Sequence, residues 1–571
     1  MMYSNGSTSN MVRHVKLKHP FEYETVNIKS KPTATATTSH EEMKEVTSTQ
    51  EYGDTQRSKQ PKLADFVEKT QLYKPDSSKK KLIDHDILNM IVKDMQPLSI
   101  VENIGFRQLL HRLDPKYPII ARSTLTQLLP QRYEAEKQRL KASMSLVSSV
   151  SVTTDHWTSI ATDAYTTVTA HFIDDDWILH SPVLLTRSSD MRHTSENLHR
   201  ELHEAFVEFG IQDKVSCIVT DNARNVTNAA KMASEHHPCF AHTLNLAVKD
   251  AIRKDEALQV VVKKAKAIVN YFKSSTVATN MLRAVHLTNK TSFVKLKQDV
   301  ETRWNSSYDM LSQYVRQHDA ILNVLIKEGR MGMCLSPEEV EIINKAIEIL
   351  QPFKEATAEM SAEKFTTISK VLPMIKILKS KINQTTESSL AEKLKDNMSA
   401  RFDPMESSIF LQISTLLDPR FKKRGFPNEI SMLGCIDTVK QLIASKDDVE
   451  RKPEGTEEKQ PKSKESSSLW DDFDEEDDEI EVQTLSASEM ELKYYLECKK
   501  IERSSDPLVW WKMNCHALPR LASLAKKYLA TPSTSVPSER IFSKTGELIS
   551  KKRSNLKKSN VDMIIFLNKN C

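Results

Sequence analysis

The sequence predicts an α/β fold with a large all-α portion, and two observations lead to this prediction. Strand-like runs gather between about residues 147 and 220, where apolar and small polar residues alternate. From about 240 to 445, nearly every segment repeats its apolar residues at helical spacing. We therefore expect a mixed sheet that is joined to a long series of helices.

Four strands and one helix account for the first of these regions. In the first strand, Val150 and Val152 alternate with small polar residues, which is typical of a half-buried strand. The segment HTSENLHRELHEAFVEFG has the spacing of an amphipathic helix, with Thr194 or Ser195 as its N-cap. The strand KVSCIVT follows and ends at Asp221. The predicted strands are 147–154, 164–173, 177–186 and 214–220.

Helical periodicity continues on both sides of these regions. Short helices are expected between 81 and 145, from the apolar spacing in LIDHDILNMIVKDM and TLTQLLPQRYEAEKQRL. The last predicted helices are 486–502, 515–529 and 536–550, followed by VDMIIFL. Two low-complexity stretches, 21–80 and 446–484, are expected to be disordered. In the second stretch nine of the eleven residues from 471 to 481 are acidic, so this block should repel itself and stay solvated.

Composition excludes several classes of protein. Lys and Arg number 81 against 77 Asp and Glu, and a net charge of +4 over 571 residues does not by itself indicate nucleic-acid binding. None of the 10 glycines precedes a lysine, so a Walker-type loop is absent, as is a GxGxxG loop. We recognise no signal peptide and no membrane span. The 7 scattered cysteines favour a reducing intracellular compartment.

Two aspartates follow predicted strands directly. Asp155 comes after the strand 147–154, and Asp221 comes after KVSCIVT. If these strands are neighbours in one sheet, the two carboxylates meet at one edge, where they can bind Mg²⁺ ions that clamp a phosphodiester. The alternative is that each aspartate only forms a turn or caps a helix.

Eight motifs in order resemble those of the hAT superfamily of DNA transposases, over most of the chain. The segment IVKDMQPLSIVENIGFRQLL is similar to the helical DNA-binding segment of that family. The remaining motifs are TTDHWTS, VTDNARNVTNAA, CFAHTLNLAV, ETRWNSSYDML, LDPRFK, DPLVWW and TPSTSVPSERIFSKTGELISKKR. The resemblance implies an RNase H-like mixed sheet that is interrupted by a long helical insertion.

The resemblance also assigns site residues. It implies a catalytic triad of Asp155, Asp221 and Glu539, with Mg²⁺ as cofactor if the protein is catalytic. From the residues alone, Glu539 is equally a capping glutamate on a helix. Trp304 would stack on an extruded base, with Arg303 beside it on the DNA, while the alternative for Trp304 is a tryptophan of the core.

The N-terminal segment resembles the second half of a BED-type zinc finger. His14 and His19 match its histidine pair, and Arg13, Lys16 and Lys18 would face DNA phosphates. The cysteine pair of such a finger is missing, because the first cysteine is Cys217. We expect an incomplete site, which binds Zn²⁺ only if the missing half is present in the full-length protein. The sequence leaves open a truncated gene model or a dead finger.

Two further features have a bland and a specific interpretation. Cys239 and His242 form a C-x-x-H pair without a second pair at finger spacing, so a structural role is expected. The C-terminal region resembles the hAT dimerisation region, and the apolar residues of its end would form an exposed stripe on which two chains associate. The alternative is that this stripe packs within the chain, against Trp510 and Trp511. The stripe is Ile541, Phe542, Leu548, Met563, Ile564, Phe566 and Leu567.

The domain plan and the functional hypotheses follow from these assignments. The expected parts are 1–20 (second half of a BED finger), 21–80 (linker), 81–145 (helical DNA-binding segment), 146–250 (first part of the RNase H-like core), 251–485 (helical insertion with the acidic loop 446–484) and 486–571 (last part of the core and dimerisation region). We expect a nuclear, DNA-binding, self-associating regulator of transcription derived from a transposase. One alternative is an active cut-and-paste transposase. The other is a purely structural helical interaction protein, and the DNA-binding segment and the intact acids disfavour this second alternative.

Overall fold

The structure is a computed structural model, and the part of the chain it describes lies within one unit, Thr70–Cys571. The described residues are 71–158, 162–189, 191–362, 365–385, 388–450, 486–541 and 557–571, without the side chains of 446–450. The predicted finger 1–20, nearly all of the linker 21–80 and nearly all of the acidic loop lie outside these ranges. The first helix begins at Ser78, so the end of the predicted linker belongs to the fold.

Six strands form the expected mixed sheet, with spatial order β3-β2-β1-β5-β6 and with β4 also paired to β2. β1 runs antiparallel to β2 and parallel to β5, and β5 runs parallel to β6. The sequence did not predict the short strand β6. The strands are β1 (Val150–Thr158), β2 (Ala164–Ile173), β3 (Leu179–His180), β4 (Val183–Ser189), β5 (Val215–Thr220) and β6 (His236–Pro238).

Two predicted strand boundaries were wrong. The single strand expected over 177–186 is two strands, because the chain breaks at Ser181 and Pro182, and proline has no N–H to give to a ladder. The first strand does not end before Asp155. It continues to Thr158, since β2 pairs with it along this whole stretch, with Asp155 opposite Thr167.

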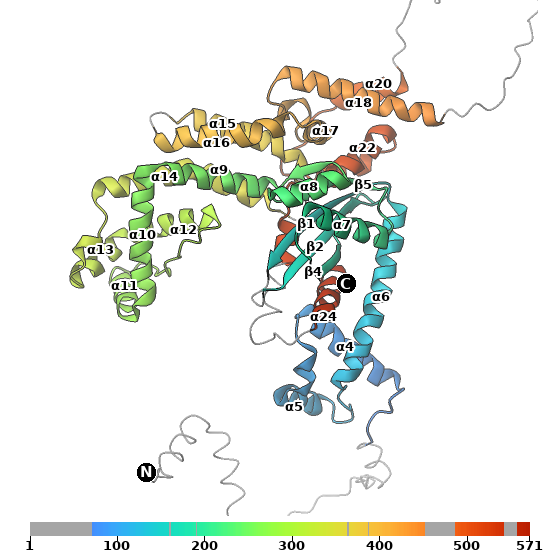
Figure 1. Ribbon diagram of the computed structural model, residues 1–571, viewed down its shortest axis with the longest axis horizontal. Coiled ribbons are helices and arrows are strands. Elements are labelled where there is room, and N and C mark those ends of the chain that lie inside the picture. Colours follow the sequence, from blue (N-terminus) through green and yellow to red (C-terminus); the bar gives the residue numbers. More distant parts are fainter. Residues whose placement is uncertain are drawn as a thin grey trace, which may run out of the picture. The chain divides into compact units, whose positions relative to one another are not determined.

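One side of the sheet is covered by helices from both ends of the chain. The C-terminal helix α24 packs against β4, α6 and α4 (Figure 1). The sequence predicts short helices before the sheet, yet α6 runs through Pro130 as one helix, with Leu125 and Leu140 buried at its two ends. The helices of this layer are α4 (Ser78–Lys93), η1 (Leu98–Glu102), α5 (Ile104–Leu113), α6 (Arg122–Leu146), α7 (Ser195–Phe209) and α24 (Lys558–Asn570).

The other side of the sheet meets the helical insertion and the helices that follow it. Opposite faces of β5 belong to different cores: Ile218 packs in the core with α6 and α24, whereas Cys217 and Val219 pack in the core with the insertion. The remaining helices are α8 (Arg224–Ala233), α9 (Phe240–Lys254), α10 (Glu256–Ser274), α11 (Thr276–Thr288), α12 (Trp304–Arg316), α13 (His318–Lys327), η2 (Met331–Met333), α14 (Pro337–Met360), η3 (Ile368–Lys370), α15 (Val371–Asn383), α16 (Ser389–Glu406), α17 (Ile409–Leu416), η4 (Lys422–Gly425), α18 (Glu429–Glu450), α20 (Ala487–Glu497), α21 (Pro507–Asn514) and α22 (Pro519–Leu529).

Within the described residues, the C-terminal apolar stripe does not form an exposed surface. Ile564, Phe566 and Leu567 are completely buried, and the ring of Phe566 meets Tyr133 of α6 edge-on at a centroid distance of 4.8 Å. The intramolecular alternative therefore holds for α24, although its partners are α4, α6 and β4 rather than the predicted tryptophans. Phe542 and Leu548 lie outside the described residues. No helix in the described ranges is long and apolar enough to cross a membrane.

Candidate functional site

The parallel pairing of β1 and β5 brings the two predicted aspartates to one edge of the sheet. Thr153 of β1 lies opposite Val219 of β5, so Asp155 and Asp221 each follow this pair by two residues. The backbone N–H of His156 donates to Asp155 at 3.0 Å, and the N–H of Ala223 donates to Asp221 at 3.1 Å. The two aspartates thus also make the local turn contacts of the alternative interpretation.

Glu539 reaches the same edge through the residue that precedes it. The chain is helical from residue 536 to 541, and Ser538 is completely buried on the sheet. Its hydroxyl lies 2.9 Å from the Thr153 hydroxyl and 3.4 Å from that of Thr169. Because Thr153 is two residues before Asp155, this contact ties the Glu539 helix to the strand that carries Asp155.

The three carboxylates interact electrostatically. Burial, then the charge of Glu539 and then that of Asp221 raise the pKa of Asp155 to about 7, against the opposing hydrogen bond from His156. Within the described part of the chain, no lysine or arginine pairs with Asp155. The negative charge at this edge is therefore unbalanced around Asp155, which is typical of functional sites.

The donor set has the chemistry that Mg²⁺ prefers, since carboxylate oxygens are its usual protein ligands and a cation would relieve the repulsion that raises the pKa of Asp155. The positions of the side chains favour metal binding less than their chemistry does. No group of three or more His, Cys, Asp and Glu among the described residues is close enough to hold a metal ion. Magnesium binding by Asp155, Asp221 and Glu539 therefore stays a prediction.

A buried hydroxyl-rich loop holds the Glu539 helix in place. The N–H of Ser535 donates to the Cys239 Sγ at 3.3 Å, and the N–H of Phe240 donates to the Ser533 carbonyl at 2.9 Å. Cys239 also caps α9, as its expected structural role requires. The sequence reasoning missed these anchoring side chains, although the run TPSTSVPS is an unusual concentration of hydroxyls. The buried ones are Thr531, Ser533, Thr534, Ser535 and Ser538.

The insertion places Arg303 beside Glu539. Its side chain is 70% exposed, and its guanidinium lies 4.0 Å from the Glu539 carboxylate. Asn245 of α9 holds this turn, accepting from the N–H of Trp304 at 3.0 Å and donating to the carbonyl of Thr302 at 3.1 Å. The turn before α12 thus places a positive charge next to Glu539.

Trp304 lies in the hydrophobic core, as the alternative interpretation of this residue expects. The residue is 2% exposed, and its ring packs edge-on to Tyr308 at a centroid distance of 6.2 Å. Its indole offers no exposed face for a base in this structure, and its Nε1 has no hydrogen-bond partner among the described residues. The finger residues Arg13, His14, Lys16, Lys18 and His19 lie outside the described ranges.

His156, next to Asp155, was also missed as part of this site. Its Nδ1 lies 3.0 Å from the hydroxyl of Thr166, which donates to Glu201 at 3.1 Å. Burial and then the neighbouring His193 lower the pKa of His156 to about 4, so this imidazole is neutral at physiological pH. The histidine therefore adds no positive charge that would balance Asp155.

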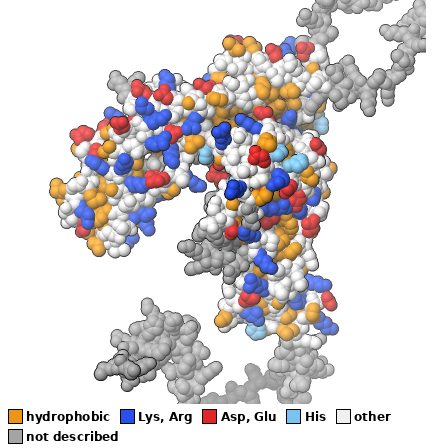
Figure 2. Space-filling view, viewed as in Figure 1, with side chains coloured by type: hydrophobic (Ala, Val, Ile, Leu, Met, Phe, Trp, Pro, Cys, Tyr) orange, Lys and Arg blue, Asp and Glu red, His pale blue; other side chains and the backbone are white. Residues whose placement is uncertain are grey.

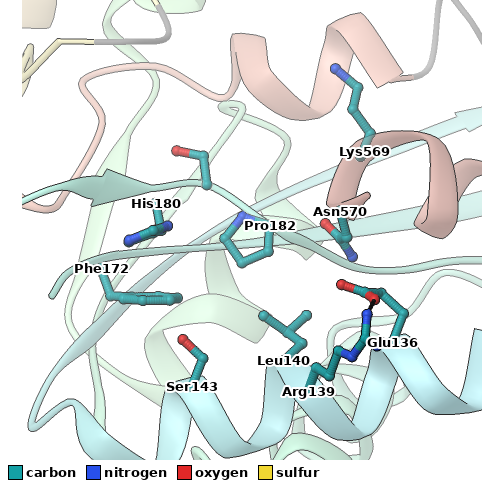
Figure 3. Close-up of a pocket in the computed structure, with 10 residues that line it drawn as sticks. Glu136, Arg139, Leu140, Ser143, Phe172, His180, Pro182, Lys569 and Asn570 are labelled. Atoms are coloured by element: carbon teal, nitrogen blue, oxygen red, sulfur yellow. Dashed lines mark hydrogen bonds and ion pairs between the residues drawn. The ribbon is translucent and has the colours of Figure 1, made fainter. Parts of the chain in front are cut away.

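A cavity of about 350 Å³ lies elsewhere, between α6, the β3–β4 turn and the end of α24 (Figure 3). In Figure 3, Glu136 and Arg139 from α6 form an ion pair at 3.0 Å, and His180 stacks on Phe172. None of the three predicted acids lines this cavity. The cavity is therefore separate from the candidate site.

Three family models match the chain, in the order in which the motifs occur. Residues 153–241 match the ZBED1 RNase-like domain, residues 237–349 match the ZBED1 RNase-like helical domain, and residues 491–571 match the hAT family C-terminal dimerisation region. The first model includes Asp155 and Asp221, and the third includes Glu539. The expected RNase H-like α/β fold with a helical insertion is thereby confirmed.

Curated relatives cover most of the chain. Zinc finger BED domain-containing protein 4 of Homo sapiens is 29% identical over 86% of the chain, and zinc finger BED domain-containing protein 6 of Homo sapiens is 24% identical over 86%. A protein of Zea mays that is named for the AC transposase is 26% identical over 83%. The chain spans 43%, 55% and 63% of the lengths of these relatives, respectively. Together the matches confirm the resemblance that the motifs carry: over most of its length the chain is similar to hAT transposases and to zinc finger BED domain-containing proteins.

Proposed function

We propose that this protein binds DNA as a self-associating regulator of transcription in the nucleus. The observation that supports DNA binding best is the exposed Arg303, whose guanidinium lies 4.0 Å from the Glu539 carboxylate, because an arginine next to an acid that interacts with Asp155 can contact the phosphate of a bound DNA strand. Figure 2 shows Lys and Arg side chains spread over the face in view rather than gathered in one patch, so the proposal rests on this residue. Self-association is supported by the match of 491–571 to a dimerisation region.

The salt dependence of DNA binding tests the role of Arg303. With a labelled duplex, Arg303→Gln should raise the dissociation constant roughly threefold to tenfold, and should lower the slope of log affinity against log salt by about one. Arg316→Gln is the matched control, because this arginine is also exposed and lies at the other end of the same helix. Equal affinities and slopes for wild type and Arg303→Gln would reject the proposed phosphate contact.

DNA strand cleavage is a second candidate function, which the raised pKa of Asp155 favours. Mg²⁺ held by the three acids would supply Lewis-acid stabilisation of a phosphodiester oxygen. Supercoiled plasmid should then be nicked by the wild type with Mg²⁺, and not by Asp155→Asn or Glu539→Gln. Equal nicking by the wild type and these variants would reject this role, and so would intact plasmid with the wild type.

A zinc-dependent contribution belongs to the finger-like segment. His14 and His19 would supply two ligands, and Arg13, Lys16 and Lys18 would contact phosphates. A structural zinc site normally has four ligands. The proposal is therefore that Zn²⁺ binds here only where a cysteine pair completes the set.

A further inference from the structure

The helical insertion contains a long stretch without acidic residues. Between Glu256 and Asp299 the sequence has no aspartate and no glutamate, but it has eight lysines and arginines. If the 77 acids were spread evenly over the 571 residues, about six of them would fall in a stretch of this length. The stretch covers nearly all of α10, all of α11, which contacts α10, and most of the segment that leads to Arg303 (Figure 1). This part of the insertion is therefore strongly positive.

Three of these cations line one groove of about 290 Å³. Lys273 comes from the last turn of α10, Arg283 from α11, and Lys295 from the segment that follows α11. All three residues are exposed, and every other residue that lines the groove is neutral. We call this surface the α10–α11 groove. It brings together three positive charges and no negative one.

The helix that packs on α11 does not neutralise the groove. This helix, α13, contains Asp319 and is followed by Glu328. Neither acid lines the groove, and Glu328 accepts from the hydroxyl of Tyr271 at 3.2 Å. Within the described part of the chain, no aspartate or glutamate forms an ion pair with any of the three groove cations. Their charge is therefore available to a ligand.

Other cations of the stretch are already paired, and they use up the acids nearest to it in the sequence. Asp299 and Glu301, the first acids after the stretch, both pair with Lys266, at 3.4 Å and 3.2 Å. Lys297 pairs with Asp309 of α12 at 3.2 Å. The acids around the stretch thus balance cations that lie outside the groove.

The arginine of the groove is held in a defined orientation. The Arg283 guanidinium lies over the ring of Phe293, 5.2 Å from its centroid, and donates to the Asn280 side chain at 3.4 Å. The buried His286 meets the same ring edge-on at a centroid distance of 5.9 Å. A guanidinium that is stacked on a ring keeps N–H groups at its edge for phosphate oxygens. The groove therefore combines one oriented arginine with two lysines.

The extent of the positive stretch favours a long polyanion over a small anion. Lys263 and Lys290 are also exposed, although they do not line the groove. Lys295 and Arg303 are eight residues apart, so the chain between them spans at most about 29 Å. A DNA strand has one phosphate per about 3.4 Å, and about ten base pairs cover this distance. One DNA molecule can therefore contact both the groove and Arg303.

We propose that the α10–α11 groove binds phosphates of the DNA backbone, as a second contact beside that of Arg303. This inference rests on DNA binding in the proposed function and adds to it an anchor on the insertion. Phosphate contacts fix the position of DNA and supply an affinity that falls with salt, but they carry no sequence information. The groove should therefore bind DNA of any sequence.

The salt dependence of DNA binding by the full chain tests the groove. The measurement uses a labelled duplex of about 20 base pairs at several salt concentrations. The triple variant Lys273→Gln/Arg283→Gln/Lys295→Gln should raise the dissociation constant at least about tenfold at about 100 mM salt. It should lower the slope of log affinity against log salt by about two to three, because three phosphate contacts are lost.

A second triple variant separates the groove from the net charge of the protein. Lys381→Gln/Lys395→Gln/Arg424→Gln removes two lysines and one arginine from exposed positions on α15, α16 and η4, none of which line the groove. This control should bind DNA nearly as well as the wild type does. The melting temperature of each variant verifies that it folds.

Chemical acetylation of lysines gives an independent measurement of the same contact. DNA should protect Lys273 and Lys295 of the wild type from acetylation and should leave Lys381 reactive. If the groove lysines are protected without DNA, and deletion of residues 471–481 removes this protection, the acidic segment of the same chain occupies the groove. That result would overturn the proposal.

The outcomes also distinguish the groove from DNA binding itself. A wild type that binds no DNA even at low salt overturns both this inference and the proposed function. If the wild type binds DNA and the two triple variants have equal affinities and equal slopes, the groove makes no phosphate contact of its own. DNA binding then remains, and the effect of Arg303→Gln decides whether Arg303 supports it.

Discussion

Asp155 at the edge of the sheet and Asp418 in the LDPRFK turn are both shielded aspartates, and they differ in charge balance. Asp418 is completely buried, and it accepts from the Arg420 guanidinium at 2.7 Å and from the Ser369 hydroxyl at 2.5 Å. Asp155 has two acids near it and a pKa of about 7. A balanced buried charge joins parts of the fold, whereas an unbalanced one indicates a site that awaits a cation or a proton.

The largest expected effect on the free energy of unfolding comes from replacing Asp418, whose charge is balanced by Arg420. Asp418→Asn should lower the free energy of unfolding by about 3–5 kcal/mol, because the buried Arg420 guanidinium keeps its charge without its partner. Urea denaturation measures this change. Asp437→Asn is the control, since its pair with Lys440 at 3.9 Å is exposed and should contribute less than about 1 kcal/mol. A loss of stability equal to that of the control would show that the buried pair of Asp418 and Arg420 does not stabilise the fold more than an exposed pair does.

The unbalanced aspartate should behave in the opposite way. The pKa of Asp155 is raised in the folded state, so its contribution to stability is present below the unfolded pKa of about 4 and is lost as the pH rises through about 7. Asp155→Asn should therefore raise the free energy of unfolding at pH 8 by about 2–4 kcal/mol, since each pKa unit corresponds to about 1.4 kcal/mol. Its effect at pH 4.5 should be much smaller.

Asp174→Asn is the matched control for the pH dependence. Burial opposes the effect, but hydrogen bonds from His180 and from the N–H of Ile178 lower the pKa of Asp174 overall. Its stabilising contribution is thus present above the unfolded pKa and lost as the pH falls through the folded pKa. This variant should lose stability at neutral pH. A gain at pH 8 in both variants would show that the raised pKa of Asp155 is not the cause.

A bound divalent cation should balance the negative charge around Asp155, as Arg420 balances that of Asp418. If Asp155, Asp221 and Glu539 bind Mg²⁺, a concentration of about ten times the dissociation constant stabilises the wild type by about 1.4 kcal/mol. Thermal unfolding at pH 8, with and without Mg²⁺ at equal ionic strength, measures this change. Asp155→Asn should show a much smaller shift. The same shift in both proteins would place the ion elsewhere.

The order of the elements and one part of the site could be predicted from the sequence. Alternation indicated β1 and β2, and the strand before Asp221 placed this aspartate beside Asp155. The three-residue strand β6 is too short for a periodic pattern, and Pro182 divides a run that otherwise resembles one strand. Glu539 required the family resemblance, since its position depends on a contact between residues 385 positions apart in the sequence.

The buried nature of Trp304 could not be read from its motif. TRWN contains an exposed arginine and a buried tryptophan side by side, because Arg303 precedes α12 and Trp304 begins it. A motif shows that neighbouring residues occur together, and only the direction of each side chain shows which of them meets solvent. The same holds for α24, whose spacing suits either an exposed or a packed stripe.

The smallest expected effect concerns the contact that brings Glu539 to Asp155. Ser538→Ala removes a hydroxyl that touches Thr153 and Thr169, and it should lower the free energy of unfolding by about 1 kcal/mol, because Thr153 keeps its contact with His171 at 3.1 Å. The exposed Ser504→Ala should have no measurable effect. If Ser538 also holds Glu539 near Asp155, Glu539 moves away in the variant and the pKa of Asp155 is raised less than in the wild type. The stability that protonated Asp155 contributes should then be lost at a lower pH in the variant than in the wild type.

A double-mutant cycle separates this tether from a general loss of packing. Thr153→Val and Ser538→Ala should be non-additive, since either change breaks the same contact. Residues that act independently would instead give a double variant whose loss equals the sum of the two single losses. Additive losses together with an unchanged pH profile would mean that Ser538 only fills space, and that the proximity of Glu539 to Asp155 is set by the buried loop through Ser535 and Cys239.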